Sequence, residues 1–116
     1  MPKHSALSLR SVAKFLRLAH PAAYPVKLRR AKLPGWFGDT NLYTRASGSK
    51  FFKIRLASGM DEEVSILILL HEWAHAKVWR TGKQESARET DHDAEWGVAH
   101  AHIWSDLHDD DPETLE

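Results

Sequence analysis

The sequence predicts a small α+β protein, in which a small, mostly antiparallel sheet from the middle of the chain packs against helices at both ends. Segments with helical apolar spacing lie toward the two ends of the chain, and short segments of alternating apolar and polar residues lie between them. The 116 residues are one domain's length, and the absence of cysteine excludes disulfides, cysteine zinc sites and thiol nucleophiles. We therefore expect a single domain over residues 1–116, with an acidic tail from about residue 108.

Residues 5–20 are predicted to form an N-terminal amphipathic helix that ends before Pro21, because proline cannot continue a helix. Its apolar stripe consists of Leu9, Val12, Leu16 and Ala19. Charged residues interrupt this segment, so it has no long apolar run of the kind found in signal peptides or membrane spans. We expect a cytoplasmic protein with no membrane contact.

Short strands are predicted in the middle of the chain. Residues 26–33 alternate weakly, residues 34–41 have the composition of a turn, and residues 42–45 form a short strand. Lys50–Ala57 alternates most clearly, and its apolar face consists of Phe52, Ile54 and Leu56. We interpret this last strand as a candidate for pairing with an extended peptide substrate, and an ordinary sheet edge protected by Lys and Arg is an equal alternative.

Two more helices are predicted after the strands. The first runs from residue 62 to about residue 80, because Asp61 is a suitable N-cap and Gly82 a suitable C-terminal stop. The second runs from about residue 93 to residue 107. Its inward stripe consists of Trp96, Ala99 and Ile103.

Two histidines and a glutamate interrupt the apolar sequence of the first of these helices. His71 and His75 are four residues apart, so their imidazoles lie on one face, one turn apart, and can bind one Zn²⁺ ion. Glu72 lies about 100° around the helix from His71, where a carboxylate can take a proton from water that zinc activates. This H-E-x-x-H pattern predicts a zinc site. The alternative is a pair of core histidines satisfied by backbone or carboxylate groups.

A catalytic zinc site needs a third protein ligand and an open position for water. We predict His92 as the third ligand, because it lies on the inward face of the C-terminal helix. Glu95, about 60° away on the helix, is the alternative third ligand, or a carboxylate that orients an imidazole. The remaining histidines of this region, interpreted as surface or helix-end residues, are His100, His102 and His108.

Residues 69–104 resemble the active-site block of SprT-like zinc metallopeptidases, and the likeness extends over roughly residues 34–105. The matching residues are His71, Glu72, His75 and Ala76 in the helix, His92 as third zinc ligand and Trp96 as the aromatic four residues later. Asp93 departs from the family, which often has glycine there, and the chain lacks the cysteine-rich zinc ribbon of many members. The resemblance implies a minimal zincin-like domain that hydrolyses a protein or peptide substrate, with Glu72 as the catalytic base.

Charge is divided between the two halves of the chain. Residues 1–55 contain twelve Lys and Arg and one acid, for a net charge of +11, and residues 56–116 carry −11. A basic half can contact DNA, and the alternative is that the halves attract each other or are simply solvated. The alternative function is a structural zinc site, or a vestigial zincin that acts as a nucleic-acid- or protein-binding module.

Overall fold

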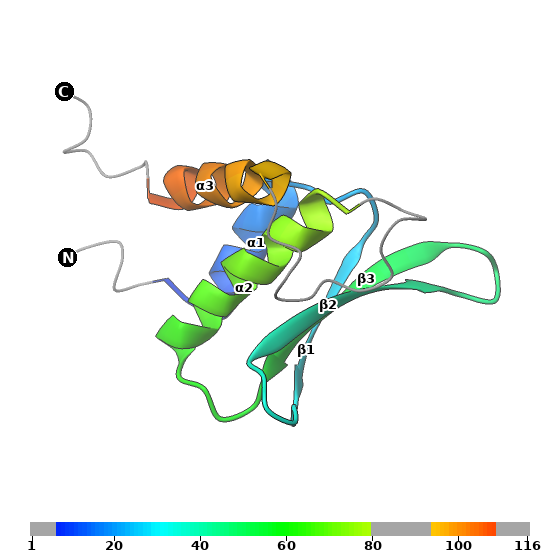
Figure 1. Ribbon diagram of the computed structural model, residues 1–116, viewed down its shortest axis with the longest axis horizontal. Helices are drawn as coiled ribbons and strands as arrows, with labels where there is room; N and C mark the ends of the chain where they lie inside the picture. Colours follow the sequence, from blue (N-terminus) through cyan, green and yellow to red (C-terminus); the bar gives the residue numbers. More distant parts are fainter. Residues whose placement is uncertain (1–6, 80–93, 109–116) are drawn as a thin grey trace.

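Three helices lie together on one face of a three-stranded sheet in the computed structural model of the chain, which describes residues 7–79 and 94–108 (Figure 1). The elements in chain order are α1 (Leu9–Ala19), β1 (Val26–Ala31), β2 (Gly38–Thr44), β3 (Lys50–Ala57), α2 (Glu62–Lys77) and α3 (Ala94–His108). The predicted α+β class is confirmed. In the described ranges, no helix has the length and apolar character needed to cross a membrane.

β3 is the central strand of this sheet, and β1 and β2 are its edges. β2 pairs with β3 antiparallel, but β1 pairs with β3 parallel, so the sheet is mixed rather than mostly antiparallel. The loop after β1 crosses the end of β3, where the Ala57 N–H donates to the Phe37 carbonyl at 2.8 Å. The chain then runs back along the other side of β3, against the direction of β1. The interpretation of β3 as an edge for a peptide substrate is wrong, because both of its sides are paired.

The predicted alternation of β3 is confirmed. Phe52, Ile54 and Leu56 are fully buried, and Ile54 and Leu56 belong to the same core as Leu69 and Leu70 of α2. Among the described elements, α2 is the helix that packs on β2 and β3, while α1 and α3 pack on α2. A helix enclosed in this way must be apolar on most of its sides, which explains the long apolar run before the motif.

α1 begins later than predicted, at Leu9, because the Ser8 hydroxyl accepts a hydrogen bond from the Ser11 N–H at 3.0 Å and caps the helix. Its buried residues are Val12, Ala13 and Leu16. Ala19, which was predicted to lie in the apolar stripe, is exposed. The next residue, the C-cap His20, is buried in its place, because the chain leaves the helix toward α2 and α3.

His20 joins the three helices. Its Nδ1 lies 2.6 Å from Nζ of Lys77 on α2, and its Nε2 lies 2.7 Å from Oδ2 of Asp106 on α3. An ammonium group can only donate, so Nδ1 accepts and Nε2 carries the proton that is donated to Asp106. The indole N–H of Trp73 donates to the His20 carbonyl at 2.7 Å. These contacts set the position of α3 over the part of α2 that carries the histidine motif.

Candidate metal centre

The two histidines of the motif lie one turn apart on α2. The centroids of the His71 and His75 rings are 5.2 Å apart. His75 is buried and His71 is half-buried. The Asp61 side chain accepts from the Val64 N–H at 2.9 Å, which confirms the predicted N-cap and determines where the helix begins. The histidine pair thus lies in the last two turns of a capped helix, at a place that helical spacing alone predicts.

α3 places two further rings beside the histidine pair. The Trp96 ring centroid lies 5.0 Å from that of His71 and 5.5 Å from that of His75. The Trp96 indole N–H donates to the His71 carbonyl at 3.3 Å. His100 stacks on Trp96 at 4.9 Å and lies 6.3 Å from His71. The predicted inward direction of Trp96 is confirmed, whereas the interpretation of His100 as a surface residue is wrong, because its ring packs on Trp96.

Glu72 points toward β2 and is held there by a threonine. The Thr40 hydroxyl lies 2.7 Å from Oε1 of Glu72 and 3.1 Å from the Glu72 carbonyl oxygen. The hydroxyl has one proton to donate, so these two acceptors share it. Thr40 is fully buried and Glu72 is 6% exposed. Sequence reasoning missed Thr40, because residues 34–41 were interpreted as a turn, whereas β2 begins at Gly38.

A glycine at the start of β2 lets α2 approach the sheet. A Cβ atom on Gly38 would lie 2.7 Å from Cγ2 of Ile68 and 3.1 Å from the carbonyl oxygen of Arg55. It would also lie 3.4 Å from Cγ of Glu72. Any side chain here would therefore push α2 away from β2, and with it the Glu72 carboxylate away from Thr40.

Among the described residues, no third His, Asp or Glu groups with His71 and His75 as a metal ligand. His92, the predicted third ligand, lies outside the described residues. Glu95, the alternative, is exposed and lines a separate hollow with Lys77 and His102. Within residues 7–79 and 94–108, no three His, Asp or Glu side chains group so that they could hold a metal ion. The two imidazoles with a buried carboxylate beside them nevertheless fit part of the donor set of a zinc site.

The predictions for the other two histidines of α3 agree with the structure. His102 is exposed. His108 lies in the last turn of α3, where its Nδ1 is 2.8 Å from the Trp104 carbonyl oxygen.

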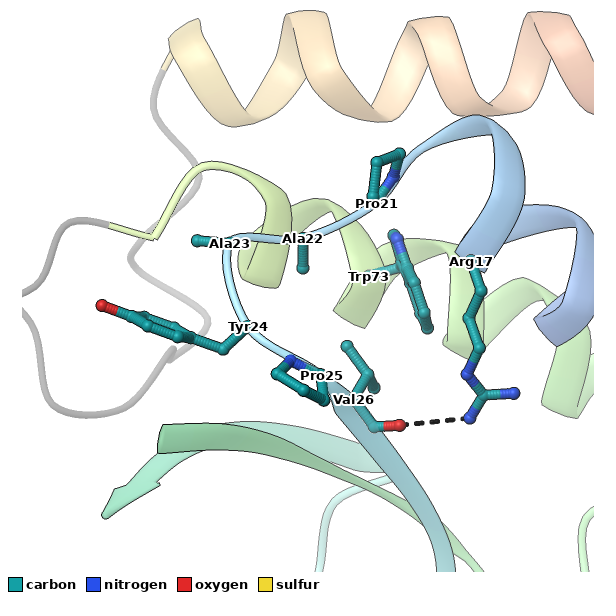
Figure 2. Close-up of a pocket in the computed structure, with 8 residues that line it drawn as sticks. All are labelled: Arg17, Pro21, Ala22, Ala23, Tyr24, Pro25, Val26 and Trp73. Atoms are coloured by element: carbon teal, nitrogen blue, oxygen red, sulfur yellow. Dashed lines mark hydrogen bonds between the residues drawn. The ribbon is translucent and has the colours of Figure 1, made fainter. Parts of the chain in front are cut away.

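A hollow of about 390 Å³ lies beside Trp73, between α1 and the segment that leads into β1 (Figure 2). Arg17 is the charged residue among those that line it, and its guanidinium donates to the Val26 carbonyl at 3.1 Å (Figure 2). Among the described residues that line the hollow, none carries an imidazole or a carboxylate, so these residues supply no side-chain ligand of the kind that zinc prefers.

Comparisons with known proteins found no match. No protein-family model, no curated protein and no solved structure is similar enough to this chain to count as one.

Thr40→Val should lower the free energy of unfolding by about 1–3 kcal/mol, because valine keeps the shape of threonine but removes a hydrogen bond to a buried carboxylate. Chemical denaturation measures this loss. Thr44→Val is the matched control, since Thr44 is exposed at the end of the same strand, and it should change stability by less than about 0.5 kcal/mol. Equal losses in the two variants would contradict a particular role for the contact between Thr40 and Glu72.

Proposed function

We propose that this chain is a zinc-dependent metallopeptidase of the SprT-like type. The observation that carries the proposal is the pairing of His71 and His75, with ring centroids 5.2 Å apart, beside the buried Glu72. Two imidazoles and a carboxylate inside an apolar helix would be costly to bury if they served only packing. The same three groups in this order are what metal-assisted peptide hydrolysis needs.

Each residue has a separate role in the proposed reaction. His71 and His75 hold the metal through neutral imidazoles, with His92 as the proposed third ligand and Glu95 as the alternative. Bound zinc supplies a Lewis acid that polarises the scissile carbonyl and activates water. Glu72 takes the proton of the attacking water and delivers it to the leaving amine. Thr40 acts through Glu72, because its hydroxyl donates to one carboxylate oxygen and so orients the carboxylate.

A purely structural zinc site is less well supported. Such a site is closed by four protein ligands. In the described part of the chain, two imidazoles are paired and Glu95 lines a different hollow. Of the described residues outside α2, His100 brings a further imidazole near this pair, 6.3 Å from His71, and its ring stacks on Trp96.

The zinc content of the purified protein tests the proposal. We expect about one zinc per chain in the wild type and a large loss in His71→Ala and His92→Ala, measured by inductively coupled plasma mass spectrometry. His102→Ala is the matched control, because His102 is an exposed histidine on α3, and it should keep its zinc.

Two other results would change the assignment. Zinc retained in His92→Ala but lost in Glu95→Gln would make Glu95 the third ligand. A wild type that binds no zinc after reconstitution would make the histidine pair a packing feature, and the peptidase proposal would fail.

A further inference from the structure

The face of the sheet that points away from the helices carries a group of cationic and aromatic side chains. Successive residues of a strand point to opposite faces, and the apolar residues of β3 point toward α2, so the residues between them point outward. The register of the three strands assigns their neighbours to the same face. This outer sheet face includes Lys27 and Arg29 from β1, Phe51, Lys53 and Arg55 from β3, and Asp39, Asn41 and Tyr43 from β2, with the small Ala31 and Ala57 at its end.

Cations stand side by side on the outer sheet face. Lys27 is the register partner of Lys53, and Arg29 is the register partner of Arg55. Adjacent strands are about 4.8 Å apart, so like charges at partner positions repel each other. Protection of a sheet edge explains cations on an edge strand, but it does not explain Lys53 and Arg55, because β3 is the central strand.

One acid on this face neutralises one of the four cations. Asp39 accepts from Nε of Arg55 at 2.9 Å and also from its NH2 group. The side-chain hydrogen bonding with Asp39 raises the pKa of Arg55, so the guanidinium stays charged. Lys27, Arg29 and Lys53 form no ion pair with any residue of the described ranges. The face therefore keeps a positive charge that matches an anionic partner.

The aromatic rings lie among these cations. Tyr43 stacks on Phe51, with ring centroids 5.5 Å apart and planes 17° from parallel, and Tyr43 is 39% exposed. The Lys27 ammonium lies 4.9 Å from the centroid of the Phe51 ring, and the Lys53 ammonium lies 4.8 Å from that of Tyr43. Phe51 is half-buried, and the Arg45 guanidinium lies 4.3 Å from its ring centroid. The exposed Tyr43 ring and the open part of Phe51 can accept the π-face of a base when the flexible cations move from the rings to the phosphates.

We propose that the outer sheet face binds single-stranded nucleic acid. Bases stack on Tyr43 and Phe51, and the phosphates are bound by Lys27, Arg29 and Lys53. A single strand is the occupant that fits, because a duplex keeps its bases stacked inside and an acidic peptide has no bases to place on the rings. The site lies on the opposite side of the sheet from α2 and its histidines, so nucleic acid bound here leaves the candidate metal centre open (Figure 1). The proposal does not depend on peptidase activity.

Fluorescence anisotropy of the full chain with a labelled oligothymidine of about 15 nucleotides, and with oligouridine of the same length, tests the proposal. We expect a dissociation constant of about 10 µM or tighter at about 50 mM NaCl, weaker binding to a duplex, and weaker binding as salt rises. A difference between the two oligomers would show which sugar the face prefers. The dissociation constant should be the same within about twofold before and after zinc is removed with a chelator. Failure of the nucleic-acid proposal can therefore be distinguished from failure of the zinc proposal.

Two variants locate the binding surface. Lys27→Gln with Lys53→Gln should weaken binding by about tenfold or more and lower the slope of log K against log salt by about 1.4. The matched control, Arg10→Gln with Lys14→Gln, removes two exposed charges from α1 and should change binding by less than about threefold. Tyr43→Leu keeps an apolar side chain but removes the ring, and should weaken binding by about fivefold or more. Circular dichroism and thermal unfolding check that each variant is folded.

Four results would overturn the proposal. They are no binding at low salt, equal losses in the two double variants, no effect of Tyr43→Leu in a folded protein, and displacement of the oligonucleotide by polyglutamate as readily as by unlabelled oligothymidine. The last of these would show a site for any polyanion. Binding to vesicles of anionic lipid without binding to the oligonucleotides would assign the face to a membrane surface instead.

Discussion

Glu72→Gln is expected to lower peptide hydrolysis by a factor of about 10²–10⁴ while zinc stays bound, which is the usual size of the effect of a positioned general base. The glutamine side chain keeps an oxygen that can accept from the Thr40 hydroxyl, so the packing between α2 and β2 should be retained. The variant therefore loses the ability to take a proton and little else. Release of new α-amino groups from unfolded casein, measured with zinc content on the same sample, checks the result.

Glu63→Gln is the matched control for this variant. Glu63 lies exposed in the first turn of the same helix, so replacing its carboxylate by the amide of glutamine should leave the rate of hydrolysis unchanged within about twofold. Turnover retained in zinc-loaded Glu72→Gln would contradict the proposed mechanism. Loss of zinc together with loss of turnover would instead mean that Glu72 holds the site together.

Gly38→Ala is expected to lower the free energy of unfolding by about 1–3 kcal/mol, because the added methyl group meets Ile68 and the Arg55 carbonyl oxygen at contacts shorter than van der Waals distance. Cγ2 of Ile68 lies on α2, only 2.7 Å from the added methyl group, so relief of this contact moves α2 away from β2. The contact with the Arg55 carbonyl oxygen lies within the sheet and strains the pairing of β2 with β3. Urea unfolding measures the loss, and hydrolysis by the same variant should fall because Glu72 moves with the helix.

Gly97→Ala is the matched control for Gly38→Ala. Gly97 lies in α3, and a Cβ there meets no atom of the described residues within 4 Å. Alanine favours the helix over glycine, so this variant should gain up to about 1 kcal/mol of stability. A Gly38→Ala protein as stable as the wild type would show that the close approach between Gly38 and α2 is not needed.

Local patterns were sufficient to predict much of this protein. Asp61 followed by two acids predicted the start of α2, and the alternation of Phe52, Ile54 and Leu56 predicted the inner face of β3. The spacing of His71 and His75 predicted their shared face. Each of these features is set by the period of one helix or one strand, and by a cap within three residues in sequence. α2 ends at Lys77, earlier than the sequence predicts. The prediction places the end too late because no local signal before Gly82 marks a helix end.

Contacts between distant segments could be learned from the packed structure alone. The Thr40 hydroxyl meets Glu72, 32 residues away in sequence, because Gly38 lets α2 come close to the start of β2. The parallel pairing of β1 with β3 depends on which side of the hairpin the first strand joins, and alternation within one strand carries no information about that. The same pairing brings Lys27 beside Lys53 and forms the outer sheet face. Period and caps are properties of neighbours along the chain, whereas these contacts arise from the burial of several elements against one another.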